Sequence, residues 1–476
     1  MKNRLSIISM VMALLAFFLV TSSHQASADE KKYIIATDTT YAPFEYEDNG
    51  EYVGIDMDLI RAIAEDQGFE IEIRPLGFNA AVQALEAKQV DGVIAGMSIT
   101  DERKQSFDFS DPYYSAGTTF AVKKDSGIKS YDDLNGKTVS VKTGTTGADF
   151  VNSIKDEYNL KITTFEDSAN MYEDVLAGNS DAAFEDTPVM AYAIKSQGLD
   201  LEIPTDTEEA KSDLGFAVSK GENAELLQMF NDGLANLQAS GEFEEILNKY
   251  IGEDATVEKA DNSFFGLIKA NWQQLLNGLG KTLLITLVSI IFSLIIGMLI
   301  GFMSISRNTI LNGIAVVYTG IFRGLPMIVL AFFVYFGIPS MFGIKLGSTA
   351  AGIISLSLNA GAFMGEIFRG GVNAVPVGQM EAARSLGLPY RPAMSKIILP
   401  QAIRIMVPSF INQFVTTLKD TSILSVIGLV ELTQTGKIII ARTYASGNMW
   451  MIIGIMYIIV ITILTFISNR LERRLK

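Results

Sequence analysis

The chain has 476 residues and a formal net charge of −15, of which residues 29–262 carry −29 and residues 263–476 carry +12. It has no cysteine and only one histidine, His24, which lies in the leader described next; this excludes disulfides, a lipoprotein anchor, Cys/His zinc sites and Ser-His-Asp or Cys-His catalysis. The acidic first half argues against nucleic acid as a partner, and no pattern in the sequence predicts a cofactor.

The first 28 residues predict a signal peptide. A basic start is followed by the apolar run 5–20 and by an Ala-Ser-Ala cleavage site at 26–28. An uncleaved anchor helix is the alternative. With either, residue 29 emerges outside the cell.

Short strand-like runs alternate with amphipathic helices from Tyr33 to about Ile251. A second series of this kind begins with the strand-like run 137–142. About 220 such residues predict an α/β domain with two lobes, each built on a parallel sheet. Residues 255–263 are polar without apolar periodicity and predict a linker, so we place the α/β domain at 29–254.

Five apolar segments follow the linker, and the first has no charge over 24 residues, which is enough to cross a bilayer. An external residue 29 and five crossings place the C-terminus inside. We expect an all-α membrane domain at 264–476, with spans at 282–305, 310–338 (broken around 323–326), 347–368, 405–429 and 449–468.

The charges between the apolar segments agree with this topology. Most Lys and Arg residues fall on the predicted inner side, and only Lys345, Lys437 and Arg442 fall in outer loops. The patterns Gly297-x-x-x-Gly301 and Gly361-x-x-x-Gly365 predict close packing of membrane helices.

Residues 381–400 form a polar, basic segment between two of the apolar segments. Their pattern is Glu381-Ala382-Ala383, then Gly387, then Ile-x-Leu-Pro at 397–400. It resembles the EAA loop of ABC importer membrane subunits, a cytoplasmic helix that docks into a groove on a separate ATPase. The resemblance implies that Glu381, Ala382, Ala383 and Gly387 couple the chain to an ATPase partner.

The chain itself does not carry the phosphate-binding loop of an ATPase. Gly280-Lys281-Thr282 imitates the end of such a loop, but Leu275 stands where the pattern needs glycine, and no strand precedes it. We therefore expect a transport component and not an enzyme.

The α/β domain resembles the polar amino acid-binding proteins of ABC uptake, especially the glutamine-binding type. The resemblance covers 31–251 and rests on several motifs in the same order: ATDTTYAPFEY (36–46), GIDMDL (54–59), AGMSITDERKQSFDFSDPYY (95–114), VKTGTTG (141–147) and AFEDTP (183–188). It implies the type II periplasmic-binding-protein fold, with lobe 1 at about 31–113 and 215–251 and lobe 2 at about 118–210. The hinge is expected near 113–117 and 210–215.

A free amino acid offers a carboxylate, an ammonium and a side chain. Arg103 can bind the carboxylate through two parallel hydrogen bonds, and Ser98 and the start of the helix after Thr100 add donors. The resemblance implies that Asp186 pairs with the α-ammonium, assisted by the backbone of Gly96. The alternatives are a solvated charge for Arg103 and a helix cap for Asp186.

The resemblance also implies how the side chain is recognised. Tyr41 and Phe78 match two aromatic faces that enclose it, and Asp38 and Lys142 match the pair at its end. Taken singly, the two aromatic residues could belong to the core, and the two charged residues could be surface charges.

Lys142 indicates the class of substrate. Two cations about 4 Å apart repel by roughly 4 kcal/mol at an effective dielectric constant near 20, which disfavours arginine, lysine and ornithine. Asp38 disfavours ionised glutamate by the same argument, so glutamine fits best, with asparagine or protonated glutamic acid as secondary ligands. Glu185, where the glutamine-binding type has histidine, could accept an amide N–H or readmit cations.

Together these patterns predict a fused receptor and permease of a type I ABC importer in the plasma membrane, working as a homodimer with two ATPase chains. The alternative of the same architecture is an arginine or cationic amino acid importer. A ligand-gated channel would interrupt the lobes with membrane segments, a chemoreceptor would need a cytoplasmic output domain, and an enzyme on these lobes is disfavoured by the missing histidine.

Overall fold

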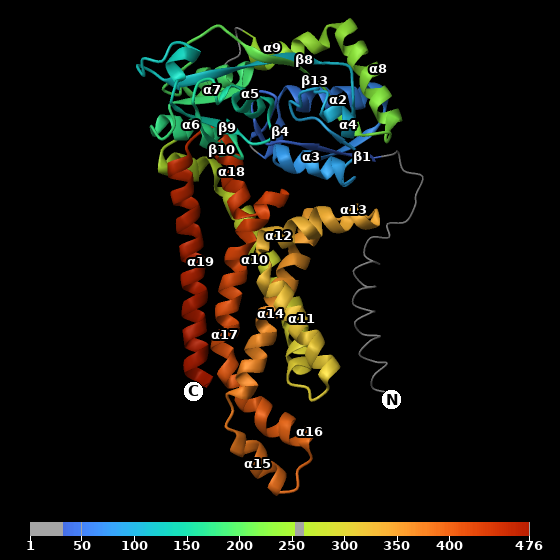
Figure 1. The fold of residues 1–476 in the computed structure, drawn as a ribbon, viewed down its shortest axis with the longest axis vertical. Coiled ribbons are helices and arrows are strands. Elements are labelled where there is room, and N and C mark those ends of the chain that lie inside the picture. The colour runs from blue at the N-terminus through green and yellow to red at the C-terminus, as the bar shows by residue number, and fades with distance from the viewer. Residues whose placement is uncertain (1–31, 49, 253–260, 476) are drawn as a thin grey trace.

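The computed structural model describes residues 32–48, 50–252 and 261–475 (Figure 1). The predicted signal peptide and most of the predicted linker lie outside these residues. The α/β lobes form one end of the molecule, and a set of long helices extends from them to the other end (Figure 1).

The first lobe is built on a five-stranded sheet with the order β5-β1-β6-β14-β7. β1 runs parallel to β5 and β6, while β14 is antiparallel to its neighbours β6 and β7. The strands are β1 (Lys32–Thr37), β5 (Glu70–Pro75), β6 (Gly92–Val93), β7 (Phe107–Phe109) and β14 (Ala217–Ser219). The helices of this lobe are α2 (Ile55–Gln67), α3 (Phe78–Glu86), α4 (Arg103–Ser106), α8 (Ala224–Ser240) and α9 (Glu242–Ile251).

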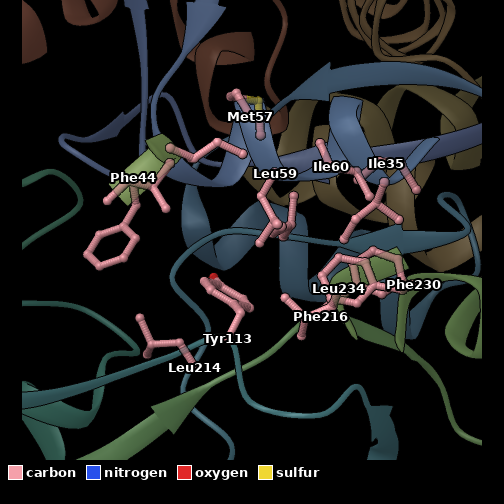
Figure 2. Packing of buried hydrophobic residues seen from close by; sticks show 14 of the residues in the cluster. Ile35, Phe44, Met57, Leu59, Ile60, Tyr113, Leu214, Phe216, Phe230 and Leu234 are labelled. Atoms are coloured by element: carbon pink, nitrogen blue, oxygen red, sulfur yellow. The ribbon is translucent and has the colours of Figure 1, made fainter. Parts of the chain in front are cut away.

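The apolar face of α2 closes the core of this lobe. Leu59, Ile60 and Ile63 recur at helical spacing and are fully buried against residues of the sheet and of α8. The rings of Phe216 and Phe230 stack with centroids 4.7 Å apart in the same cluster (Figure 2). Since β14 and α8 come after the second lobe in sequence, the first lobe needs both ends of the α/β domain.

The second lobe is built on a six-stranded sheet with the order β10-β9-β11-β8-β12, and β13 also pairs with β8. Its strands are β8 (Tyr114–Lys123), β9 (Thr138–Lys142), β10 (Lys161–Phe165), β11 (Ala182–Asp186), β12 (Leu201–Glu202) and β13 (Glu209–Leu214). Its helices are η1 (Tyr131–Leu134), α5 (Thr146–Ile154), α6 (Ser168–Leu176) and α7 (Thr187–Gln197).

The prediction of parallel sheets is correct for β5-β1-β6 and β10-β9-β11 and wrong for the strands next to the lobe crossings. β8 enters the second lobe antiparallel to β11, and β13 leaves it antiparallel to β8, with Leu214 opposite Tyr114. The chain that crosses out must return beside the chain that crossed in, so the crossing strands are antiparallel. A small sheet of β2 (Thr40–Tyr41), β3 (Glu45–Asp48) and β4 (Glu51–Val53) completes the α/β part.

The helical part contains four helices long and apolar enough to cross a membrane among the described residues, and up to five spans if a bent pair counts as one. The four are Phe264–Ser304, Ser348–Asn373, Tyr390–Ile427 and Ser446–Ile467. The elements are α10 (Phe264–Ser304), α11 (Thr309–Gly324), α12 (Met327–Phe332), η2 (Phe333–Gly337), α13 (Ile338–Phe342), α14 (Ser348–Asn373), α15 (Val377–Ser385), α16 (Tyr390–Ala393), η3 (Met394–Ile398), α17 (Leu399–Asp420), η4 (Thr421–Ile427), α18 (Leu432–Thr443) and α19 (Ser446–Leu475).

The bent pair is α11 with the helices that follow it, and the two parts meet at 104°. Pro326 has no N–H to continue α11 and forces the preceding Leu325 into an extended conformation, which ends the helix there. The bend lies where the sequence predicted a break in the span at 310–338, around 323–326. The first span differs from its prediction, since α10 begins 18 residues before Thr282 at Phe264.

The two small-residue patterns bring α10 and α14 together, as predicted. A Cβ on Gly297 would lie 2.5 Å from the Cβ of Met364 and 3.1 Å from the carbonyl oxygen of Gly361. A Cβ on Gly365 would lie 2.9 Å from Ile300. Any larger residue at these positions would push the helices apart.

Candidate functional site

A small cavity lies between the two lobes. Seven of the nine predicted binding residues line it, joined by three residues that were not predicted: Tyr41, Phe78, Gly96, Ser98, Arg103, Lys142 and Asp186, with Ala95, Thr145 and Thr146.

Strand direction explains why residues so far apart in sequence meet here. Asp38 directly follows β1, Lys142 is the last residue of β9, and Asp186 is the last residue of β11. β9 and β11 are parallel, so their carboxyl ends lie at the same edge of the second sheet. Open α/β sheets bind ligands beyond the carboxyl ends of their strands.

Arg103 connects the lobes at one side of the cavity. Its Nη1 donates to the carbonyl oxygen of Ser98 at 2.8 Å, and its Nη2 donates to the carbonyl oxygen of Gly144 at 3.0 Å. Its guanidinium carbon lies 5.4 Å from the ring centroid of Phe78. These bonds use two of the five guanidinium N–H donors, so donors remain for an anionic group in the cavity. Burial lowers the pKa of Arg103 from its usual value.

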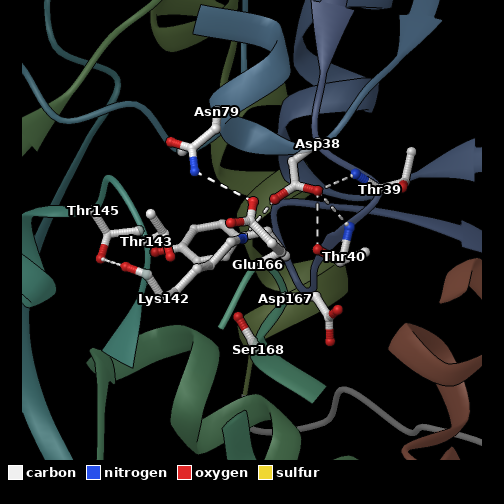
Figure 3. A network of polar contacts seen from close by, with 12 residues as sticks. Asp38, Thr39, Thr40, Asn79, Lys142, Thr143, Thr145, Glu166, Asp167 and Ser168 are labelled. Atoms are coloured by element: carbon white, nitrogen blue, oxygen red, sulfur yellow. Dashed lines mark hydrogen bonds and ion pairs between the residues drawn. The ribbon is translucent and has the colours of Figure 1, made fainter. Parts of the chain in front are cut away.

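Lys142 and Asp38 form a buried ion pair across the lobes (Figure 3). Lys142 Nζ lies 2.6 Å from Asp38 Oδ2, and the two side chains are 2% and 1% exposed. The other oxygen of Asp38 accepts bonds from the backbone N–H groups of Thr39 and Thr40 and from the Thr40 hydroxyl. Burial alone would lower the pKa of Lys142, but the Asp38 and Glu185 carboxylates outweigh it and raise the pKa, so the ammonium stays charged.

This pairing changes the charge that a ligand meets. The ammonium of Lys142 also lies 4.6 Å from the ring centroid of Tyr41, so it faces an aromatic ring as well as a carboxylate. An ammonium already paired at 2.6 Å repels a second cation less than an isolated one would. The sequence predicted that Lys142 repels a cationic ligand side chain. The ion pair with Asp38 reduces this repulsion.

Asp186 and Tyr41 meet across the lobes, and the Tyr41 hydroxyl donates to Asp186 Oδ2. Asp186 is the N-cap residue of α7, but its side chain makes no capping hydrogen bond, so capping does not account for it. Burial raises the pKa of Asp186, against the lowering effects of Tyr41, Lys142 and Arg103.

Gly96 fits closely against Tyr41. Its φ is +53°, and an added Cβ would lie 2.6 Å from the Tyr41 ring, so the position needs glycine. The Gly96 N–H donates to Asp56 Oδ2 at 2.8 Å, and the Tyr113 hydroxyl donates to the same oxygen at 3.0 Å. Only the carbonyl of Gly96 is then left for a ligand. Burial raises the pKa of Asp56 to about 7.

Glu185 lies behind the cavity wall and does not line it. Its side chain is 2% exposed, and its Oε2 accepts a 2.6 Å hydrogen bond from Ser168 Oγ at the start of α6. Burial raises the pKa of Glu185 to about 7, although Lys142 opposes this. Asp38 does not line the cavity either; it forms an ion pair with Lys142, which does.

Thr145 and Thr146 of the second lobe line the cavity but were not predicted, although the sequence contains a signal for this helix start. Thr145 is the N-cap of α5, and its Oγ1 accepts from the backbone N–H of Ala148 at 3.2 Å. Threonine just before an amphipathic segment is a usual helix start. The Thr146 hydroxyl lies 3.3 Å from that of Ser98, which adds a contact between the lobes.

The predicted coupling residues lie at the opposite end of the molecule from the cavity (Figure 1). Glu381, Ala382 and Ala383 belong to α15; Ala383 is buried and the other two are exposed. Gly387 forms the turn to α16 with φ +85°, a conformation that favours glycine. Its neighbour Leu386 is 84% exposed, which leaves an apolar side chain at the tip of this loop.

Comparison with known proteins divides the chain in two. Residues 33–253 match the family of bacterial extracellular solute-binding proteins, family 3, and residues 289–476 match the inner membrane components of binding-protein-dependent transport systems. The first family is described by solute binding, and the second by transport that depends on a binding protein.

Individual relatives cover one half or the other. The arginine transport system permease protein of Bacillus subtilis is 39% identical over 202 residues, 42% of this chain and 92% of the relative. The arginine-binding extracellular protein of the same organism is 34% identical over 244 residues, 51% of this chain and 95% of the relative. The glutamine transport system permease protein of Escherichia coli K12 is 36% identical over 203 residues, which are 42% of this chain and 93% of the relative.

Proposed function

This chain belongs to the ABC transport proteins for polar amino acids, as a solute-binding domain joined to a permease domain, and we propose that its substrate is glutamine. The chain captures the amino acid outside the cell, and a separate ATPase subunit supplies the energy for inward transport. The observation that carries the proposal is the cavity in which Arg103 and Asp186 provide opposite charges between two aromatic rings.

Each group of an amino acid has a partner in this cavity. The free donors of Arg103 and the hydroxyls of Ser98 and Thr146 suit the α-carboxylate. Asp186 and the carbonyl of Gly96 suit the α-ammonium. A ligand that takes these places lies between the rings of Tyr41 and Phe78 with its side chain directed to Lys142.

The balance of charge favours a neutral side chain. Arg103 and Lys142 carry two positive charges, and Asp38 and Asp186 carry two negative ones, so an amino acid without a side-chain charge leaves the site neutral. An amide oxygen can accept a hydrogen bond from Lys142 without adding a charge to the site. Asparagine and protonated glutamic acid also have side chains without a charge, and the asparagine side chain is shorter.

Arginine is the second candidate, and a specific observation favours it. Lys142 is already paired with Asp38, and the carboxyl of Glu185 lies behind the same wall with a pKa raised to about 7. When Glu185 is ionised the site gains a negative charge, which a guanidinium could offset. The relatives described as arginine systems are consistent with this candidate.

The membrane half supports the proposed arrangement. Lys345 and Arg442, expected in outer loops, form ion pairs with Asp91 and Asp48 of the α/β domain, so both lie on the side of the binding cavity. Large apolar side chains exposed on α10, α11 and α19 suit contact with lipid or with a second copy of the chain. We place the binding domain at 29–254, the permease domain at 264–476 and the ATPase contact at 381–400.

Titration of the full-length chain in lipid nanodiscs against the twenty amino acids tests the substrate. We expect glutamine to bind more tightly than arginine, lysine or ornithine. Tighter binding of arginine would replace glutamine by the second candidate, and no binding of any amino acid would overturn both. Uptake of the bound amino acid by vesicles that contain the chain and its ATPase then tests transport.

A further inference from the structure

A short segment of the permease domain contacts both lobes of the binding domain. α18 packs against β2 and β3 of the first lobe and against α6 of the second. In Figure 1, α18 lies directly beneath the lobes, next to the end of α19 that faces them. The segment from Arg442 to Ser446 joins these two helices, and we call it the bridging segment.

Arg442 attaches the bridging segment to the first lobe. Its Nη1 donates to Asp48 Oδ1 at 3.0 Å, at the end of β3. Its Nη2 donates to the side-chain oxygen of Asn271 on α10. The arginine side chain is only 17% exposed, so this contact is better shielded than an ordinary surface ion pair.

Tyr444 and Ser446 attach the same segment to the second lobe. The backbone N–H of Ser446 donates to Glu173 Oε1 at 3.1 Å, and its hydroxyl lies 3.3 Å from Asn170 Oδ1. The ring of Tyr444 is buried against that of Tyr172, with centroids 6.0 Å apart. All three partners in the second lobe belong to α6.

The first turn of α6 also reaches the wall of the cavity. Ser168, its first residue, donates to Glu185, which lies behind the cavity beside Lys142. Asp167 caps the helix and accepts from both the backbone N–H and the side-chain amide of Asn170, at 2.9 and 2.8 Å. One helical turn therefore carries both the contact to the cavity wall and a contact to the bridging segment (Figure 3 shows Asp167, Ser168, Lys142 and Asp38).

We propose that the bridging segment detects the distance between the lobes. The backbone from Arg442 to Ser446 can extend over about 14 Å at most, and the Arg442 and Glu173 side chains add a limited further reach. The segment can hold Asp48 and Glu173 at once only while the lobes are close together. When the lobes separate, one of the two attachments breaks, and α18 and α19 lose their connection to that lobe.

This inference rests on the proposed function, because the ligand in the cavity is what holds the lobes together. Arg103, Lys142 and Tyr41 all bridge the lobes, and a ligand between them adds further bonds across the same gap. Ligand binding then favours both attachments of the bridging segment. By reciprocity, the attachments favour ligand binding by the same factor.

Because the sequence has no cysteine, paired cysteines can be introduced without background. The test pair is Glu173→Cys with Ser446→Cys in the full chain in nanodiscs, on the second-lobe attachment. The control pair is Asp91→Cys with Lys345→Cys, which replaces a 2.8 Å ion pair between the first lobe and the loop before α14. Disulfide formation is followed with and without saturating glutamine.

We expect glutamine to accelerate cross-linking of the test pair by roughly five-fold or more, the lower range of coupling between sites. The control pair should cross-link at the same rate with and without glutamine, because it involves one lobe only. Equal rates for the test pair in both conditions, or no cross-link with ligand, would overturn the proposal. Titration of the same samples distinguishes this from failure of the proposed function: if arginine is the ligand that binds, the rates are compared with arginine.

A second measurement uses single variants with the ATPase present. Glu173→Ala removes the acceptor for the Ser446 N–H, whereas Glu173→Gln keeps an oxygen there. We expect ligand-stimulated ATP hydrolysis to fall in Glu173→Ala and to be retained in Glu173→Gln, with unchanged hydrolysis in the absence of ligand. Asp156→Asn, at an exposed carboxylate of the same lobe, is the matched control. Equal stimulation in Glu173→Ala and in the control would also overturn the proposal.

Discussion

Arg103 donates to carbonyl oxygens of both lobes and lines the cavity, so we propose that it both binds a ligand carboxylate and holds the lobes together. Replacing it with alanine leaves a ligand carboxylate buried without its partner. Loss of one member of a buried charge pair costs about 2–5 kcal/mol, or roughly 30- to 4,000-fold in Kd. We expect this loss for Arg103→Ala in calorimetric titration of the full chain.

The control for this variant is Arg61→Ala. Arg61 lies on α2 of the first lobe, is 44% exposed and is 3.8 Å from Asp58. Its removal should leave the Kd unchanged. If a folded Arg103→Ala variant bound the amino acid as tightly as Arg61→Ala, Arg103 would be only a surface charge.

Glu185 predicts how stability depends on pH. Its pKa is raised to about 7 in the folded chain from an ordinary value of 4.5, so folding takes up a proton between these values. The folded state then binds more protons than the unfolded state, and stability falls as pH rises through this window, by up to about 1.4 kcal/mol per pH unit.

Thermal unfolding of the ligand-free chain at pH 5, 6 and 7 measures this slope. Glu185→Gln removes one titrating group, so we expect its Tm to fall less between pH 5 and 7 than that of the original chain. Asp56, whose pKa is also about 7, keeps part of the slope in both proteins. Identical slopes would mean that Glu185 is ionised throughout.

At the scale of single elements, the turn between α15 and α16 carries a prediction about coupling. Gly387 has φ +85°, and an added Cβ would meet no atom within 4 Å, so Gly387→Leu projects its side chain outward beside the exposed Leu386. We expect the variant to keep amino acid binding and to lose ligand-stimulated ATP hydrolysis, because the side chain obstructs docking of the ATPase.

Gly68→Leu separates this effect from backbone strain. Gly68 ends α2 with φ +69° and has equally open surroundings, so leucine there costs the same roughly 1–2 kcal/mol of left-handed strain without touching the loop. It should retain stimulated hydrolysis. Retention in Gly387→Leu as well would contradict the docking role of the loop.

The contact of α10 with α14 predicts a second element-level result. Gly297→Leu places a side chain where Met364 and the backbone of α14 already lie, so the helices must separate. We expect loss of a monodisperse peak in size-exclusion chromatography. Gly280→Leu in the same helix, where an added Cβ meets nothing within 4 Å, should elute like the original chain.

Sequence patterns were most informative where function or chemistry fixes a residue locally. The motifs identified seven residues that line the cavity, and the apolar runs located the four long helices. What they could not give depends on contacts between distant segments: the 2.6 Å bond of Lys142 to Asp38, the bond of Tyr41 to Asp186, and the position of Glu185 behind the wall. Likewise, α18 is buried because it packs against α10, α19 and both lobes, which its own periodicity does not reveal.

At the scale of the whole molecule, the first lobe is joined to the permease domain at a second place. The Gln89 side chain donates to the carbonyl of Ile344 at 2.8 Å and accepts from the N–H of Leu346 at 2.7 Å, beside the Asp91–Lys345 ion pair. We expect Lys345→Asp to reduce ligand-stimulated ATP hydrolysis about two- to five-fold, since exposed ion pairs contribute up to about 1 kcal/mol.

Exchange of the two charges tests whether their attraction is the cause. The double variant Asp91→Lys, Lys345→Asp restores opposite charges at the same place and should recover most of the stimulated hydrolysis. A double variant as impaired as Lys345→Asp alone would show that the loss comes from another effect of the substitution.

Gly252 and Asp261 are joined by eight residues, which can extend over roughly 30 Å at most. A carrier that diffuses freely must find its pore by collision, and its delivery rate then depends on how much carrier the cell makes. Here the concentration of carrier at its own pore is fixed by chain length, in the millimolar range for short tethers. Delivery of the amino acid from carrier to pore is therefore a first-order step that does not depend on the carrier's concentration. The cell can raise uptake only by making more copies of the whole chain, which adds carriers and pores together.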